Sequence, residues 1–220
     1  MATWITHLRI GERVLKELNG IDERAFYVGS LAPDSGKMVG NFTYLPPKDV
    51  SHWKREGVSY EQRFEDNAEF FKKYVENEGD SAKYAFFLGY YVHILTDTMY
   101  VRDIIHPYIE KHGKPHWKEN IEDIRKGWYE IDFRFLERNR EYLPFEMLKT
   151  VEEFEVSSLD YFAPEDVFER ISYAVDFYSS ALSDKSCVFF THDEEFAEKM
   201  IGYMSDDIIK ILKNKHNICR

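Results

Sequence analysis

Residues 82–101 read AKYAFFLGYYVHILTDTMYV and form the most apolar segment of the chain. Their apolar side chains cover nearly the whole circumference of a helix, which is typical of a helix buried in a core. Asp80 or Ser81 can cap its first turn. We therefore expect a central, buried helix, and the rest of the fold to be arranged around it.

This apolar helix contains an ionisable pair. His93 and Asp97 are four residues apart, so their side chains share one face and can point at one ion. An unpaired carboxylate in a core costs several kcal/mol or more, so the pair must be hydrogen-bonded, ion-paired or metal-bound. A His–Asp hydrogen bond that only ties helices together and a metal site both satisfy this requirement, and the pair by itself does not decide between them.

The rest of the chain favours an all-α fold. Its 220 residues can bury one sizeable core, and we expect a single domain over residues 1–220. Signals for β-hairpins are essentially absent. Caps and apolar spacing predict a multi-helix bundle around the buried central helix, with further helices at about residues 4–18, 60–77, 117–138, 165–182 and, after a cap by Thr191 with Glu194, 192–212.

Two further segments bring candidate ligands. His7 lies in the first turns of the N-terminal helix. Residues 25–59 contain many glycines and prolines, so we expect the longest loop-rich stretch of the chain there, carrying Asp34 and His52. Loops of that length in a compact domain are usually functional or mobile.

A dense group of histidines follows the central helix. Residues 103–116 read DIIHPYIEKHGKPH, which places Asp103, His106, His112 and His116 close together. Such a density of imidazoles suits zinc. A solvated loop would also account for one or two of them, and for His112 and His106 taken singly a plain surface position is the commoner case. We assign no role to His192 or His216.

Charge and cysteine content narrow the partners. Asp and Glu number 40 against 29 Lys and Arg, and a net charge of −11 disfavours long nucleic acids but not a small phosphate ester. Cys187 and Cys219 lack Cys-x-x-Cys spacing, so any metal must be held by imidazole and carboxylate. Charged residues interrupt every apolar run near the N-terminus, so we expect neither a signal peptide nor a membrane span there. The sequence thus predicts a cytoplasmic protein.

Several segments, in this order, resemble the zinc-dependent phospholipase C family, whose wider fold group includes single-strand-specific zinc nucleases. The resemblance covers roughly residues 3–125, and the block Leu-Gly-x-x-x-His-x-x-x-Asp is its most specific element. The segments are THLRIGERVL (6–15), GSLAPDSG (29–36), His52-Trp53, AFFLGYYVHILTD (85–97) and PHWKENIED (115–123).

The resemblance implies an all-α fold enclosing two or three zinc ions. One ion would be held by Asp34, His52, His93 and Asp97, and His7 with Asp97 would take part in a neighbouring site. His116 would belong to the remaining site. The family's further histidine after the pair would correspond to Asp103 or His106, and the sequence leaves both open.

This chain departs from the family in three respects. The carboxylate expected one turn after His116 is Asn120 here, with Glu119 rotated away. We therefore expect that site to be weaker or reorganised, with Asp123 or Asp132 as candidate replacements. In the extracellular enzymes the freed N-terminal residue ligates zinc, whereas Trp4 is internal. Those enzymes are secreted, and we expect this protein not to be.

The leading hypothesis is a zinc-dependent, phospholipase C-like hydrolase of phosphate esters or phospholipids, in which a His/Asp metal cluster activates water. Asp34 would be both a ligand and the catalytic carboxylate that orients or deprotonates that water. A single-strand nuclease and a non-catalytic, metal-stabilised helical binding protein are the alternatives. Tyr44, Trp53 and Tyr60 are candidates for lining the cleft, or else pack in the core or at its rim. The oligomeric state is left open.

Overall fold

The computed structural model describes residues 2–40, 43–151, 159–180, 182–216 and 218. Helices make up nearly all of its regular structure, which confirms the predicted all-α class. The helices are α1 (Trp4–Leu15), α2 (Glu23–Leu31), α3 (Lys48–Ser51), α4 (Tyr60–Tyr74), α5 (Ser81–Tyr100), α6 (His106–His112), α7 (Lys114–Arg138), α8 (Leu143–Lys149), α9 (Pro164–Ser180) and α10 (Glu194–His216).

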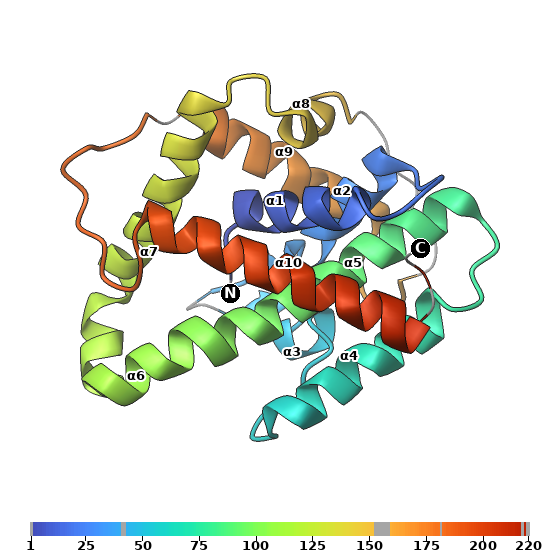
Figure 1. The fold of residues 1–220 in the computed structure, drawn as a ribbon, viewed down its shortest axis with the longest axis horizontal. Helices are drawn as coiled ribbons and strands as arrows, with labels where there is room; N and C mark the ends of the chain where they lie inside the picture. Colours follow the sequence, from blue (N-terminus) through green and yellow to red (C-terminus); the bar gives the residue numbers. More distant parts are fainter. Residues whose placement is uncertain (1, 41–42, 152–158, 181, 217, 219–220) are drawn as a thin grey trace.

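Helix α5 is the buried centre of this arrangement. Asp80 caps it by accepting the backbone N–H groups of Ala82 and Lys83. Every residue from 85 to 100 is buried. In Figure 1 α5 passes behind α10 and above α4, and it contacts both of these helices. The sequence showed apolar side chains around nearly the whole circumference of this helix. The structure explains them, because other helices pack against α5 on several sides.

The sequence prediction was wrong about the beginning of the Gly/Pro-rich stretch, which contains α2. Gly29 of α2 and Gly89 of α5 let the two helices touch. A Cβ on Gly29 would lie 1.9 Å from the Phe86 carbonyl oxygen, and one on Gly89 would lie 2.0 Å from that of Phe26. Gly29 is thus a helix-packing residue, and its contact with α5 outweighs the low helix propensity of glycine.

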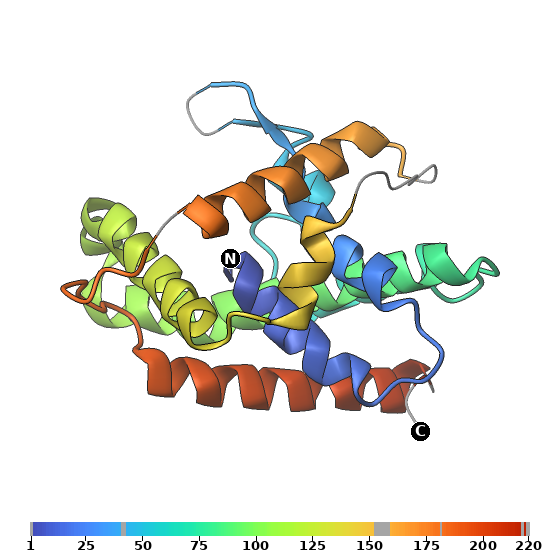
Figure 2. The same ribbon diagram turned by 90° about the horizontal axis from the view of Figure 1, so that it is seen from above.

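The remaining residues of that stretch form a small projection. A 3-10 turn at Ala32–Asp34 follows α2 directly, and β1 (Lys37–Met38) then pairs antiparallel with β2 (Tyr44–Leu45). Figure 2 shows this segment on the side of the molecule opposite α10. The expected absence of hairpins was therefore wrong for this short pair, which is too short to show an alternating pattern.

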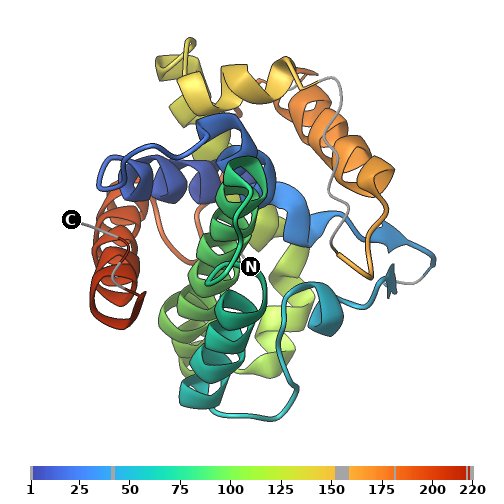
Figure 3. The ribbon, with the colours of Figure 1, turned by 90° about the vertical axis from the view of Figure 1, so that its right-hand side faces the viewer.

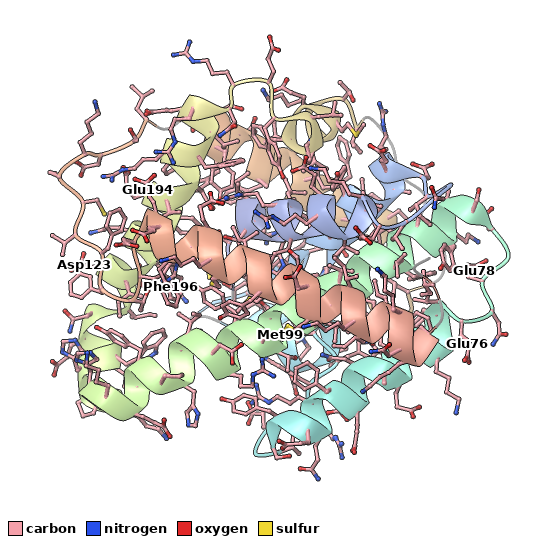
Figure 4. The ribbon with its side chains drawn as sticks, viewed as in Figure 1. Glu76, Glu78, Met99, Asp123, Glu194 and Phe196 are labelled. Carbon is pink, nitrogen blue, oxygen red and sulfur yellow. The ribbon has the colours of Figure 1, made fainter. Side chains whose placement is uncertain are left out.

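The C-terminal helices enclose the core from the other sides. Glu194, labelled at the beginning of α10 in Figure 4, forms ion pairs with Arg134 and Arg138 of α7. Helix α8 was not predicted, and α1, α4 and α10 end within four residues of their predicted ends. Figure 3 shows α9 and α10 on opposite sides of the bundle.

Among the described residues no helix has the length and apolarity needed to cross a bilayer.

The cysteine prediction concerned two residues. Cys187 is a free thiol. Cys219 lies outside the described residues.

Candidate metal centre

Five predicted ligands converge at one buried point. His7 comes from α1, Asp34 from the 3-10 turn, His52 from the end of α3, and His93 and Asp97 from α5. His7 and His93 stack with ring centroids 3.7 Å apart. None of the five is more than 6% exposed. Segments far apart in sequence thus bring three imidazoles and two carboxylates together.

The Asp97 carboxylate lies between the imidazoles. Its Oδ1 is 3.5 Å from His7 Nε2, while its Oδ2 is 3.4 Å from His52 Nε2 and 3.7 Å from His93 Nε2. On the far side, His52 Nε2 is 3.5 Å from Asp34 Oδ1. The two oxygens of Asp97 therefore face different imidazoles.

Several polar atoms at this point are buried without a hydrogen-bond partner within the described part of the chain. They are Nδ1 and Nε2 of His7, Nε2 of His52, Nε2 of His93 and Oδ2 of Asp97. Leaving such atoms unpaired in a core is unfavourable, and native proteins rarely do so without an ion or water. Their ligand atoms form two groups, His7–His93–Asp97 and Asp34–His52–His93, in each of which all atoms lie within 4.8 Å of one another. The residues present therefore fit a metal ion better than they fit a structural His–Asp hydrogen bond.

The protonation states suit metal binding. Burial lowers the pKa of His52 and of His93, so both imidazoles are neutral at pH 7. Burial opposes ionisation of Asp34 and Asp97 as well. The positive charge of Lys48 nevertheless holds the pKa of Asp34 well below its usual range, and neighbouring groups that include His7 and His93 do the same for Asp97. Neutral imidazoles and ionised carboxylates are the forms that ligate zinc.

Outer contacts orient two of the imidazoles. The His93 Nδ1 donates to the carbonyl oxygen of Ser30, 2.7 Å away, which leaves Nε2 with a free lone pair. The His52 Nδ1 lies 2.9 Å from the hydroxyl of Ser51, so its Nε2 also faces Asp97. Because α2 supplies Ser30, the close packing of α2 on α5 sets the direction of the His93 ring.

His52 is held by the chain that follows it. Trp53 adopts a left-handed backbone conformation with φ of 45°, and its ring packs edge-on against Phe70 and Tyr74. Its indole N–H donates to the hydroxyl of Tyr161. This anchor ends α3 and fixes the position of the neighbouring imidazole.

Sequence reasoning missed three groups that contact the carboxylates. The Trp4 indole donates to Asp34 Oδ2 at 2.9 Å, and Lys48 forms an ion pair with Asp34 Oδ1. The backbone N–H of Ala2 donates to Asp97 Oδ1 at 2.9 Å. An ion pair between Lys48 and Asp34 could have been predicted, because both lie in the same loop-rich stretch and Asp49 is the other acid near Lys48. No side-chain pattern signals the N–H of Ala2.

Three other predicted ligands lie elsewhere. Asp103, His106 and His116 belong to neither ligand group. Helix α5 continues into a π-helical turn at Val101–Ile105. In that turn Asp103 accepts two hydrogen bonds from Arg102, and in α6 the half-exposed His106 lies 3.7 Å from Glu110.

The surroundings of His116 are also different from those of the cluster. Its Nε2 lies 3.1 Å from the Tyr108 hydroxyl, and the Asn120 amide approaches its Nδ1 at 3.3 Å. The two carboxylates considered for this site have other partners. Asp123, on the periphery in Figure 4, binds Lys126, and the buried Asp132 accepts hydrogen bonds from Thr3 and Tyr178.

A cleft of about 590 Å³ opens beside the cluster. Asp34 is the one cluster residue that lines it, and Trp4 and Lys48 lie next to Asp34 in the same wall. Of the aromatic candidates, Tyr44 lines this cleft. Trp53 packs against the core as described, and Tyr60 contacts His106. A substrate in this cleft would reach the buried cluster through Asp34.

An all-α fold with a buried cluster of imidazoles and carboxylates beside an open cleft is compatible with a metal-dependent enzyme. The family model described as zinc dependent phospholipase C matches residues 6–188. The chain therefore belongs to the zinc-dependent phospholipase C family, as its sequence indicated. The match extends well past residue 125, where the recognised resemblance ended, and takes in α7, α8 and α9. Neither the search of curated proteins nor the search of solved structures gave a match.

Proposed function

We propose that this protein is a zinc-dependent hydrolase of phosphate esters that acts in the manner of a phospholipase C. The observation that carries the proposal is the set of buried, unpartnered imidazole and carboxylate atoms next to a cleft. Structural zinc sites are usually closed by four ligands, often cysteines, whereas His and carboxylate ligands with access to a cleft suit catalysis. The prediction of a cytoplasmic location stays a prediction.

We assign the ligands to two ions. Asp97 Oδ2 faces His52 and His93, and these three residues together with Asp34 would hold the first ion. Asp97 Oδ1 faces His7, and these two residues would hold the second ion. His93 has one free nitrogen, because its Nδ1 donates to Ser30, so it can ligate only one of them. The third ion that the family resemblance predicts at His116, with Asp103 or His106, stays a prediction and is left out of this proposal, because those residues belong to neither ligand group.

The residues of the chain have defined tasks in this proposal. Zinc supplies an acidified water molecule and neutralises charge on the phosphoryl oxygens. Asp34 lies between the cluster and the cleft, and its two oxygens are fixed by Trp4 and Lys48, so it can orient the attacking water toward the phosphorus atom. The low pKa of Asp34 keeps its carboxylate ionised for this role.

The test combines metal analysis with hydrolysis. Protein purified without added metal is analysed for zinc, and it is assayed with bis(p-nitrophenyl) phosphate before and after dialysis against a chelator. We expect about two zinc ions per chain, and activity that chelation abolishes and zinc restores. Turnover that survives complete metal removal would overturn the proposal.

Two further arms separate the alternatives. Asp34→Asn is expected to abolish hydrolysis, whereas Asp207→Asn, an equal change at a half-exposed carboxylate bound to Lys210 of α10, leaves it unchanged. An Asp34→Asn protein that loses only stability, with no ester hydrolysed by the native protein, would indicate the non-catalytic alternative. Cleavage of single-stranded DNA at low salt, with no hydrolysis of small esters, would indicate the nuclease.

A further inference from the structure

The cleft contains an arginine without an acidic partner. Arg170 of α9 lines the cleft, and in the described ranges no carboxylate pairs with it. Its guanidinium lies over the rings of Trp4 and Tyr173, 5.6 and 5.4 Å from their centroids. One terminal nitrogen donates to the Gly36 carbonyl oxygen at 3.1 Å, but the buried Nε has no partner. The guanidinium is thus held rigidly with an unused donor.

A second unused donor lies beside it. Ser35 directly follows Asp34, lines the same cleft and is 2% exposed, and its hydroxyl has no partner among the residues described. Arg170 is bound to the carbonyl of Gly36, the next residue, so the two side chains belong to the same part of the cleft wall. Buried donors are normally satisfied, and a guanidinium with a hydroxyl is a typical pair for a phosphate or carboxylate.

The nearby acids do not cancel this positive charge. Asp166 and Glu169 line the cleft too, but Lys37 binds both, at 2.8 and 3.2 Å. Those three side chains together carry one negative charge. Arg125 also lines the cleft, but its guanidinium pairs with Glu122, which lies outside the lining, at 3.4 Å. Arg170 is thus the cation of this wall that no described acid binds. The charge on this wall therefore favours an anion, despite the net charge of −11 on the whole chain.

The aromatic rings of this wall are poorly placed for a cationic head group. A quaternary ammonium binds over open ring faces. Here Arg170 already lies over Trp4 and Tyr173, and the Lys48 ammonium lies 4.9 Å from the centre of the Tyr44 ring. A choline-like group would have to displace the protein's own cations from these rings.

The Arg170 donors are close to the proposed reaction centre. The Trp4 ring that Arg170 covers donates its indole N–H to Asp34. One indole thus separates the guanidinium from the catalytic carboxylate. This spacing suits a second charged group on the same small substrate whose ester lies at Asp34.

We infer that Arg170 and Ser35 bind an anionic group, phosphate or carboxylate, on the head group of the substrate beside the ester that is hydrolysed. The inference rests on the proposed function and adds the substrate class, phosphodiesters with an anionic rather than a cationic head group. Arg170 is in this sense a specificity-determining residue.

The test compares three short-chain lipids that share their acyl chains: dihexanoyl phosphatidylcholine, phosphatidylinositol and phosphatidylinositol 4-phosphate. We expect kcat/KM of the native protein to be highest for the last and lowest for the first. Arg170→Gln is expected to lower kcat/KM for the 4-phosphate at least tenfold, as for the loss of a charged hydrogen bond, and for the other two much less. Ser35→Ala should also lower kcat/KM for the 4-phosphate more than for the other two lipids, but by a smaller factor than Arg170→Gln.

Arg13→Gln on α1, an equal change of charge at a residue that does not line the cleft, is the control and should leave all three rates unchanged. Equal loss on all three lipids in Arg170→Gln would overturn the inference, since Arg170 would then act on the shared phosphodiester or on folding. Preference of the native protein for phosphatidylcholine would overturn it as well.

A binding measurement keeps the inference separate from the proposed function. Calorimetry measures binding of inositol monophosphate to the native protein and to Arg170→Gln. If no lipid is hydrolysed, the proposed function fails, but tenfold weaker binding to Arg170→Gln than to native protein would still support the anion site. Equal binding by both proteins would overturn it.

Discussion

Two regions of this molecule contain histidines and carboxylates, and they differ in burial. In the cluster around Asp97 all side chains are buried, and several of their polar atoms have no partner. In the segment from Asp103 to His116 the side chains are bound to neighbours or open to solvent, as His106 is with its side chain 51% exposed. The second region has the denser sequence of histidines, but only the first leaves its ligand atoms without partners.

The contrast shows that a high density of histidines along the chain is a weaker indication of a metal site than convergence in a core. Solvent or a neighbouring side chain supplies the hydrogen bonds of an exposed imidazole, so binding an ion does not relieve an unpaired buried atom there. A buried imidazole that has lost its water needs another partner. The predictions below test this difference between the two regions.

The largest effect is expected from His93→Ala compared with His106→Ala. Loss of the ligand common to both groups should lower zinc affinity and hydrolysis on the order of a hundredfold or more, the upper end of the losses seen even for outer-shell residues. His106→Ala should retain both. Zinc is measured after dialysis against a competing chelator, and circular dichroism checks that each variant is folded. Comparable losses in both variants would make the exposed segment part of the site.

A smaller effect is expected from the packing that orients the buried cluster. Gly89→Ala would place a Cβ 2.0 Å from the Phe26 carbonyl oxygen, and α2, which supplies the Ser30 carbonyl to His93, would have to move. We expect the free energy of unfolding to fall by about 3 kcal/mol, at the upper end of overpacking. Gly79→Ala, where a Cβ meets nothing within 4 Å, is the matched control. Urea unfolding measures both, and equal stability would contradict the close helix contact.

The smallest effect concerns acidification of the metal-free protein. Burial lowers the pKa of His52 and His93, so below about pH 6.5 the unfolded chain takes up protons that the folded chain does not. Burial also raises the pKa of Asp132 to about 7, which has the opposite effect, because the folded state then binds a proton first. Burial also lowers the pKa of His192, to about 4. The three histidines outweigh the one carboxyl, and stability should fall by roughly 1 to 2 kcal/mol between pH 6.5 and 5.5.

Urea unfolding at several pH values measures this slope. His93→Gln should make the slope shallower, since one of these protonations is removed. Asp132→Asn should make it steeper, because the opposing carboxyl is lost. Stability that rises on acidification would contradict the neutral state of the buried imidazoles.

Much of the fold could be predicted because it depends on local patterns. The apolar run around His93 required burial wherever it lay, and the spacing from His93 to Asp97 placed both on one face of a helix. The prediction was wrong at α2, where glycine was taken as a helix breaker. In the folded protein Gly29 allows a backbone contact with Phe86 on another helix, and no local pattern contains that contact.

The sequence by itself determined an all-α fold around one buried helix and, through its motifs, the family and the five candidate ligands that converge. Only the tertiary structure decided which other residues reach those ligands. It brought the Ala2 N–H, the Trp4 indole and Lys48 to the two carboxylates, and it left the Asp103–His116 segment apart. The reason is that helical periodicity fixes directions within one helix, whereas contacts between helices depend on how their surfaces pack.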